Sequence, residues 1–114
     1  MNFTRFLKQY VFNVKQPKYK GQITLPYDIE QVYQTIPTLY GGAWGFAGSQ
    51  IENISNPFGA TLAYRTTNGT TARYLLSKAG EKSTQIEIST ETPTGHALFY
   101  FEDIVKALKK KLEK

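Results

Sequence analysis

The fold of this chain is decided by residues 49–90, SQIENISNPFGATLAYRTTNGTTARYLLSKAGEKSTQIEIST. Apolar and polar residues alternate along this stretch, as in strands that bury one face and expose the other. Three short turn segments interrupt the alternation: NPFG at 56–59, NG at 68–69 and AGEK at 79–82. Turn residues between alternating runs are typical of hairpins. The stretch therefore predicts four antiparallel strands, near 49–55, 60–67, 70–78 and 83–90.

The turns also predict a register. If 68–69 is a two-residue loop, Tyr64 lies opposite Arg73 and Leu62 lies opposite Leu75. The other two turns give the pairs Ile51–Tyr64, Asn53–Leu62, Leu75–Ile86 and Arg73–Ile88. One face, which we expect to meet the C-terminal helix, then carries Ile51, Asn53, Leu62, Tyr64, Arg73, Leu75, Ile86 and Ile88. The opposite face carries Glu52, Ile54, Thr61, Ala63, Arg65, Tyr74, Leu76, Gln85 and Glu87.

Upstream of this meander, the sequence predicts one more strand and a short helix. Residues 19–25, YKGQITL, alternate and end at Pro26, which indicates a half-buried strand. Asp28 followed by Gln31 has the form of a capping box, which marks the start of a helix. One face of this helix, which stops before Pro37, carries Ile29, Val32, Tyr33 and Ile36.

The two ends of the chain predict two further helices. After ETPTG, an apolar repeat at steps of three and four indicates a long C-terminal helix, formed by Leu98, Phe101, Val105, Leu108 and Leu112. An N-terminal helix is predicted over residues 3–13, with an apolar stripe of Phe3, Phe6, Leu7, Tyr10, Val11 and Val14. We therefore expect one α+β domain over 1–114: an antiparallel meander of about five strands packed against the C-terminal helix, with an extra N-terminal helix.

Composition narrows the classes of protein. The 114 residues contain no cysteine, which excludes disulfides and thiolate chemistry. No apolar run has the roughly 18 residues that a membrane span needs, and the N-terminus is too polar for a signal peptide, so a cytoplasmic protein is expected. The net charge of +5 comes mostly from the two ends of the chain. Basic ends suit anionic partners, or simply a solvated lysine surface.

Arg73 is the most notable polar residue of the predicted apolar face. A guanidinium in such a place must be paired, because an isolated buried charge costs several kcal/mol. A structural partner would be the ring of Tyr64, or a carboxylate such as Glu91 or Glu102. Alternatively, Arg73 anchors the carboxylate or phosphate of a ligand in a pocket otherwise lined by apolar and tyrosyl groups.

The element order resembles a known superfamily. A strand, then ITLPYDIEQVYQTI (23–36) with Val32 and Tyr33 on its short helix, then Trp44, a meander and a long closing helix resemble the helix-grip pattern of START-like and Bet v 1-like proteins. The resemblance implies a curved sheet around the C-terminal helix, with a lipid, sterol or other apolar ligand between them. The chain has about five predicted strands where that superfamily usually has seven.

The stretch TLYGGAWGFAGSQ, residues 38–50, combines glycines with aromatic residues. It lacks the lysine of a Walker loop and follows a helix, so it does not predict nucleotide binding. Glycine permits a close bend, after which Trp44 and Phe46 fold back to fill the core. The functional alternative is that Trp44 and Phe46 form the entrance of the cavity between sheet and helix.

These residues favour a small non-enzymatic domain that binds an apolar or amphipathic small molecule. His96 is the only histidine and has no spaced partner, so no catalytic residues, metal or cofactor are expected. Arg73 would pair with an anionic head, Tyr64 and Asn53 would form hydrogen bonds, and Trp44 and Phe46 would line the entrance. One alternative is a protein- or membrane-interaction domain that uses the N-terminal helix, including as a homodimer. Another is a nucleic-acid-binding module, although no recognition motif supports it.

Overall fold

The computed structural model describes residues 17–41 and 46–113. The strands are β1 (Lys18–Leu25), β2 (Gly48–Asn56), β3 (Gly59–Thr66), β4 (Thr71–Gly80) and β5 (Ser83–Glu91). The helices are α2 (Ile29–Thr35), the 3-10 helix η1 (Ile36–Leu39) and α3 (Ala97–Leu112). The predicted α+β class, with its five-stranded antiparallel sheet and long C-terminal helix, is confirmed. The helix predicted over 3–13 lies outside the described residues.

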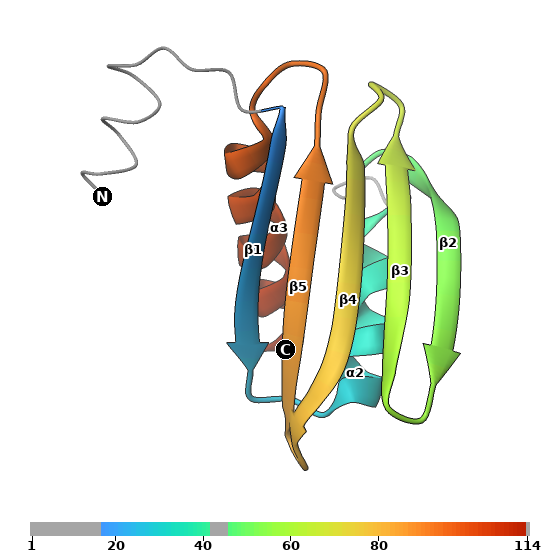
Figure 1. Ribbon diagram of the computed structural model, residues 1–114, viewed down its shortest axis with the longest axis vertical. Coiled ribbons are helices and arrows are strands. Elements are labelled where there is room, and N and C mark those ends of the chain that lie inside the picture. The colour runs from blue at the N-terminus through green and yellow to red at the C-terminus, as the bar shows by residue number, and fades with distance from the viewer. Residues whose placement is uncertain (1–16, 42–45, 114) are drawn as a thin grey trace, which may run out of the picture.

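The five strands form one antiparallel sheet in the order β1-β5-β4-β3-β2. Strands β2 to β5 follow one another as hairpins, and β1 pairs with β5 along its whole length, from Lys18 opposite Glu91 to Leu25 opposite Thr84. Figure 1 shows α2 and α3 behind the sheet, on the same side. One face of the sheet is therefore covered by helices, and the other face points away from them.

Strand β1 shows the alternation that its sequence predicts. Tyr19, Gly21 and Ile23 are half-buried and Leu25 is buried, while the residues between them are exposed. The ring of Tyr19 lies 4.9 Å from that of Phe101 on α3. Gly21 sits directly under the same ring, because a Cβ placed on it would lie 2.4 Å from Cζ of Phe101. The absence of a side chain at Gly21 lets α3 approach β1 closely.

Helix α2 begins where the sequence predicts, at Asp28. The Asp28 side chain accepts a hydrogen bond from the backbone N–H of Gln31 at 2.8 Å, which satisfies one free donor of the first turn. The chain continues directly into η1, and three side chains of these two helices are almost fully buried: Val32, Ile36 and Leu39. The pair thus covers the part of the sheet that α3 does not reach, around β4.

Helix α3 supplies the largest share of the cover over the sheet. Its buried side chains recur at helical spacing: Ala97, Leu98, Phe101, Ile104, Leu108 and Leu112. Full burial of one large apolar side chain contributes about 1.5–3 kcal/mol, so this stripe is a major source of stability. Lys109, Lys110 and Lys111 occupy the last turn, where they complement the helix dipole. No helix in the described part of the chain is long and apolar enough to cross a membrane.

The predicted register between β3 and β4 is wrong by one residue. Thr66 and Thr70 close the hairpin, since the Thr66 N–H donates to the Thr70 carbonyl at 2.8 Å. The loop therefore has three residues, 67–69, and Gly69 adopts a left-handed φ of 86°. Tyr64 consequently lies opposite Ala72, and Arg73 lies opposite Ala63.

This shift inverts β4 relative to the prediction. Because side chains alternate, Tyr74 and Leu76 point into the core, while Arg73 and Leu75 point away from the helices. The turn that follows lies at Glu81 and Lys82, with a bulge between Lys78 and Gly80, so the predicted β4–β5 pairs are wrong as well. The observed partners are Leu75–Glu87, Leu76–Ile86, Arg73–Ser89 and Tyr74–Ile88.

The register between β2 and β3 is only partly as predicted. Asn53 lies opposite Leu62, which confirms that pair. A bulge at Ile51 separates Gln50 from Glu52, and Tyr64 pairs with Gln50 instead of Ile51. Ile51 is 45% exposed and does not belong to the core.

The contact between Gly21 and Phe101 generates a stability prediction. Gly21→Val should lower the free energy of unfolding by about 1–3 kcal/mol, because the new side chain displaces Phe101 and with it α3. Phe101→Leu in the same chain should recover part of that loss. Thr24→Val, on the exposed side of β1, is the matched control. Urea denaturation measures all four proteins, and equal losses for the Gly21 and Thr24 variants would contradict the contact.

Candidate functional site

Arg73 does not lie at the predicted site. Its side chain is 48% exposed on the face of the sheet that points away from the helices. Its Nε donates to Oε1 of Glu52 on β2 at 3.2 Å. The predicted location of Arg73 among apolar side chains is therefore wrong, and the physical reason is the inversion of β4. An exposed ion pair of this kind contributes little to stability.

Tyr64 and Asn53 do lie on the side of the sheet that the helices cover, but in different roles. The Tyr64 hydroxyl accepts a hydrogen bond from Nε2 of Gln50 at 2.8 Å. Oδ1 of Asn53 accepts one from the Tyr33 hydroxyl at 2.6 Å, which ties β2 to α2. Asn53 thus holds two elements together, whereas Tyr64 belongs to a larger aromatic cluster.

Backbone hydrogen bonds join Phe46 to residues near the start of the glycine stretch. The Phe46 N–H donates to the Leu39 carbonyl at 2.7 Å, and the Gly41 N–H donates to the Phe46 carbonyl at 3.0 Å. Gly41 has a φ of 80°, which few other residues adopt. Phe46 is half-buried and packs against the core, as one of the predicted alternatives requires. Trp44 lies outside the described residues.

Tyr40, the residue that follows η1, is the centre of a chain of ring contacts that includes four other aromatic residues. The Tyr40 ring is parallel to that of Tyr64, with the ring centroids 4.0 Å apart. The ring of Phe46 is tilted relative to that of Tyr40, with the centroids 5.6 Å apart. Tyr64 meets Tyr74 edge to face at 6.2 Å, and Phe46 meets Tyr100 of α3 edge to face at 5.4 Å. The cluster of Tyr40, Phe46, Tyr64, Tyr74 and Tyr100, here the aromatic cluster, therefore joins the sheet to η1 and α3.

The hydroxyl groups of the aromatic cluster lie in an apolar setting. The Tyr40 and Tyr74 hydroxyls share a hydrogen bond of 2.5 Å inside the core. Burial raises the pKa of both hydroxyls far above the ordinary value, because a tyrosinate would be poorly solvated there. Burial also raises the pKa of Tyr64 and of Tyr100. These tyrosines are therefore neutral hydrogen-bonding groups at physiological pH.

Tyr100 has a buried hydroxyl that is not satisfied. The nearby Tyr40 hydroxyl partly opposes the rise in its pKa, but the two groups do not adopt the geometry of a hydrogen bond. Among the described residues the Tyr100 hydroxyl has no hydrogen-bond partner. Such a group costs about 1–3 kcal/mol relative to a satisfied one.

A groove of about 400 Å³ opens beside Tyr100. It lies at the end of the sheet where the β3–β4 hairpin and the β5–α3 connection meet, at the top of Figure 1. The described residues that line it are Phe46, Ala47, Thr66, Thr67, Asn68, Thr70, Thr92, Thr94, His96, Phe99, Tyr100 and Asp103. We call it the end groove. Its aromatic rings come from Phe46, just before β2, and from Phe99 and Tyr100 on α3. Its other described side is rich in threonines, here the threonine wall: Thr66, Thr67, Thr70, Thr92 and Thr94.

The threonine wall is held by its own hydrogen bonds. Thr70 Oγ1 donates to Thr92 Oγ1 at 3.1 Å, and the Thr92 and Thr94 hydroxyls lie 2.9 Å apart. The Thr70 N–H meets both Thr66 Oγ1 and Asn68 Oδ1 at 3.2 Å. These bonds connect the hairpin to the segment that leads into α3. The wall is therefore a preformed part of the end groove.

His96 precedes α3, as the sequence predicts, and lines the end groove. Its ring lies 6.1 Å from that of Phe99, and its side chain does not cap the helix. Within residues 17–41 and 46–113, no group of three or more His, Cys, Asp or Glu side chains could hold a metal ion. Asp103 is the only lining residue in that part of the chain with a formal charge at neutral pH.

Tyr40, Phe99 and Tyr100 are not among the site residues that the sequence predicts. The signal for the last two is LFYF at 98–101, four large apolar residues in succession. Only one side of a helical turn can face the sheet, so such a run must present rings on other sides too. No comparable signal marks Tyr40, because its role depends on strands that lie far away in the sequence.

Comparison with known proteins adds no family assignment. No protein-family model matches the chain, and no curated protein matches it. Membership in the START-like superfamily therefore stays a prediction.

The hydrogen bond between Tyr40 and Tyr74 can be tested by a double-mutant cycle. Tyr74→Phe should lower the free energy of unfolding by about 1–3 kcal/mol, because the Tyr40 hydroxyl is left buried without its partner. Tyr40→Phe should have a similar effect. The double variant should lose less than the sum of the two, since no unpaired hydroxyl of this pair remains. Guanidinium denaturation gives the four values, and strictly additive losses would rule out a stabilising bond.

The raised tyrosine pKa values predict loss of stability at alkaline pH. In the folded chain the pKa values of Tyr40 and Tyr74 lie above the unfolded value of about 10. The unfolded state therefore releases protons first as pH rises, and folding stability is complete below pH ~10 and falls above it. Melting temperatures across this range, with tyrosinate absorbance recorded in parallel, test the effect. Full ionisation of all eight tyrosines without unfolding would contradict it.

Proposed function

We propose that this protein binds a small amphipathic molecule in the end groove. The observation that carries the proposal is a groove of about 400 Å³ whose described lining combines aromatic rings with threonine hydroxyls. Small-molecule sites commonly have volumes of about 300–1,000 Å³, apolar walls and a few polar groups that orient the ligand. The end groove has these properties, with Phe46, Phe99 and Tyr100 as its aromatic wall.

The position of the site differs from the one that the helix-grip resemblance implies. The space between α3 and the sheet is packed with fully buried side chains, including Tyr74, Ile86, Ile88, Ile104 and Leu108. A ligand there would have to displace this core. The end groove needs no such displacement, because it opens to solvent at the end of the same two layers.

The charge of the end groove indicates a neutral or cationic ligand. Asp103 is its only formally charged described residue, and it is exposed. Arg73, the predicted anchor for an anionic head, lies on the opposite face of the sheet. The amide of Asn68 would orient the polar end of the ligand, and the rings of Phe46, Phe99 and Tyr100 would contact its apolar body. The threonine wall would limit the ligand's size.

Fluorescence titration with N-phenyl-1-naphthylamine, a neutral aromatic probe, tests the proposal. The wild-type protein should raise the probe's emission with a saturating 1:1 stoichiometry. Phe99→Ser should weaken binding roughly tenfold, which corresponds to the ~1.4 kcal/mol expected for loss of an aromatic contact. Tyr100→Phe keeps the ring that lines the groove and removes only the buried hydroxyl, so it should leave the affinity for the probe unchanged.

A matched control distinguishes the end groove from other apolar surface. Phe58→Ser removes another exposed ring, at the β2–β3 turn, far from the groove in the fold. It should leave the affinity for the probe unchanged. A loss of affinity with Phe58→Ser but not with Phe99→Ser would refute the end groove as the site.

A further inference from the structure

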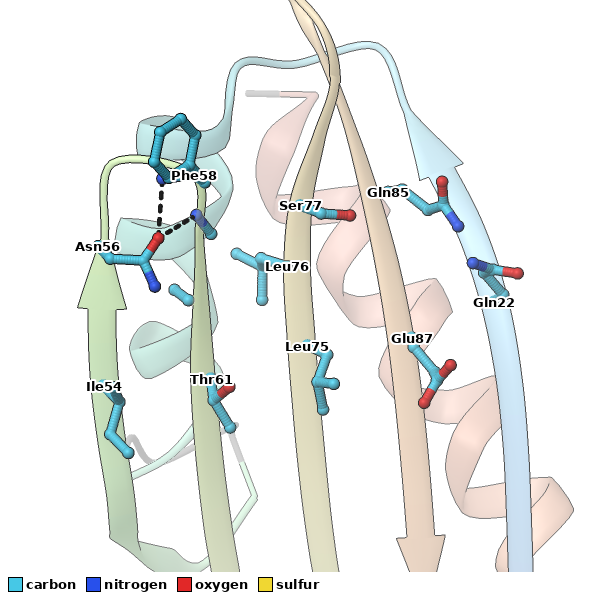
Figure 2. A pocket seen from close by; sticks show the side chains of 12 residues that line it. Gln22, Ile54, Asn56, Phe58, Thr61, Leu75, Leu76, Ser77, Gln85 and Glu87 are labelled. Atoms are coloured by element: carbon cyan, nitrogen blue, oxygen red, sulfur yellow. Dashed lines mark hydrogen bonds between the residues drawn. The ribbon is translucent and has the colours of Figure 1, made fainter.

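The face of the sheet that points away from α2 and α3, here the outer face, is not covered by any described element. Both helices lie behind the sheet in Figure 1. Pairing between strands places one residue of each strand in a continuous row across this face: Gln22, Glu87, Leu75, Thr61 and Ile54. Figure 2 shows these five side chains on their strands. The row is polar at β1 and apolar toward β2.

The apolar part of the row borders a hollow of about 400 Å³. Phe58 is 80% exposed at the β2–β3 turn, Ile54 is 59% exposed and Leu75 is 41% exposed. The hollow exists because Gly59 and Ser77, which pair beside them, have almost no side chain. A Cβ on Gly59 would lie 2.4 Å from the Leu76 carbonyl oxygen, so a larger residue does not fit there. We call this surface the outer hollow.

Most charges of the outer face lie away from the outer hollow. Lys18 lies 4.0 Å from Glu91, Arg73 lies 3.2 Å from Glu52, and Arg65 on β3 is a further exposed cation of this face. Among the described residues that line the hollow, Glu87 is the only charged one, and Lys20 approaches it at 3.7 Å. An occupant of the outer hollow therefore has to be mainly apolar, with positive charge favoured near Glu87.

Residues 1–16 of this chain have that chemistry. Their sequence contains three cations, Arg5, Lys8 and Lys15, and no acid. At helical spacing, residues 3–14 place six large apolar side chains on one face. Left in water together, these side chains would form a sticky patch. They require a cover, as do Phe58, Ile54 and Leu75.

The geometry of β1 places this segment within reach of the outer hollow. The Pro17 carbonyl accepts a hydrogen bond from the Thr92 N–H at 2.8 Å, which fixes the point where β1 starts. Along β1, Gln22 lies ~13 Å from Lys18. Across the sheet, β4 lies ~10 Å from β1. Leu75, which is level with Gln22, is therefore ~16 Å from Lys18 along the face. Residues 14–17 span ~13 Å when extended. A helix over 3–13 adds ~16 Å.

The inner face beside β1 is already occupied by α3. Phe101 of α3 lies over Gly21 and against Tyr19. For a segment that leaves β1 at Pro17, the outer hollow and the end groove both offer exposed apolar surface, and the outer hollow has the larger set of exposed apolar side chains, Ile54, Phe58 and Leu75.

We propose that residues 3–14 dock as an amphipathic helix on the outer hollow of the same chain. The apolar stripe packs against Ile54, Phe58 and Leu75, and a cation of the segment lies near Glu87. Docking covers both apolar surfaces at once. The outer hollow and the end groove have no described lining residue in common.

The test uses the full chain, which has no native cysteine. Gln9→Cys, off the predicted stripe, carries a nitroxide spin label, and amide signals are recorded by two-dimensional NMR. We expect selective loss of signal from Ile54, Thr61 and Leu75, and retained signal from α3. Leu75→Ser should abolish this selective loss. Phe99→Ser, an exposed apolar substitution on α3, should leave it unchanged, and both spectra report whether the variant is folded.

Four results would overturn the proposal. Signal loss on α3 or at the end groove would place the segment on the inner side. Loss seen only when spin-labelled chain is mixed with separate isotope-labelled chain would show docking on a second copy. Uniform or absent loss would show that the stripe does not pack on this domain and is left for a membrane or another partner. Intramolecular loss that Leu75→Ser does not change would exclude the outer hollow.

Discussion

The three-residue loop between β3 and β4 determines which side chains this sheet buries. Thr66 and Thr70 close the loop, and Gly69 takes the left-handed conformation that lets three residues reverse the chain. Side chains alternate along a strand, so a loop shorter by one residue would turn β4 over. Arg73 would then lie under the helices, and Tyr74 would point into water. The core, the aromatic cluster and the pattern of the outer face all depend on this loop.

The aromatic cluster connects the core of the sheet with the end groove. Tyr74 is fully buried at the centre of β4, and its hydroxyl meets that of Tyr40. Tyr40 stacks on Tyr64 and lies close to Tyr100, which lines the groove. A ligand at Tyr100 would thus contact a set of rings whose other end is locked into the sheet. Such a wall is preorganised, and rigid walls reduce the entropy cost of binding.

Much of the fold was predictable because local signals agree with the tertiary structure. Alternation located all five strands to within about two residues at each boundary, and Asp28 and Gln31 marked the start of α2. On β3 and β5, the predicted inward faces agree with the core: Leu62 and Tyr64 on β3, and Ile86 and Ile88 on β5. Strand β4 was assigned the wrong face, and on β2 the bulge takes Ile51 out of the predicted pattern while Asn53 keeps its partner Leu62.

The inversion of β4 and the position of the site were not predictable from local signals. Asn-Gly suits both a two-residue and a three-residue loop, and the two differ in which face of the next strand is buried. Both faces of β4 carry apolar residues, Leu75 on one and Tyr74 with Leu76 on the other, so composition did not decide between them. Tyr40 and Tyr100 come together only through packing. The misplacement of Arg73 as a ligand anchor followed directly from the wrong loop length.

The bulge at Ile51 has a consequence for how the protein behaves at high concentration. Strand β2 lies at one edge of the described sheet, and a straight free edge is a template on which strands of other molecules can add. The extra residue between Gln50 and Glu52 breaks the regular spacing of donors and acceptors and increases the local twist. At the opposite edge, Lys18 and Lys20 on β1 place positive charge where a second copy would approach. Both edges of the described sheet therefore oppose the edge-to-edge addition of strands from other molecules, although the strands are rich in β-branched and aromatic residues.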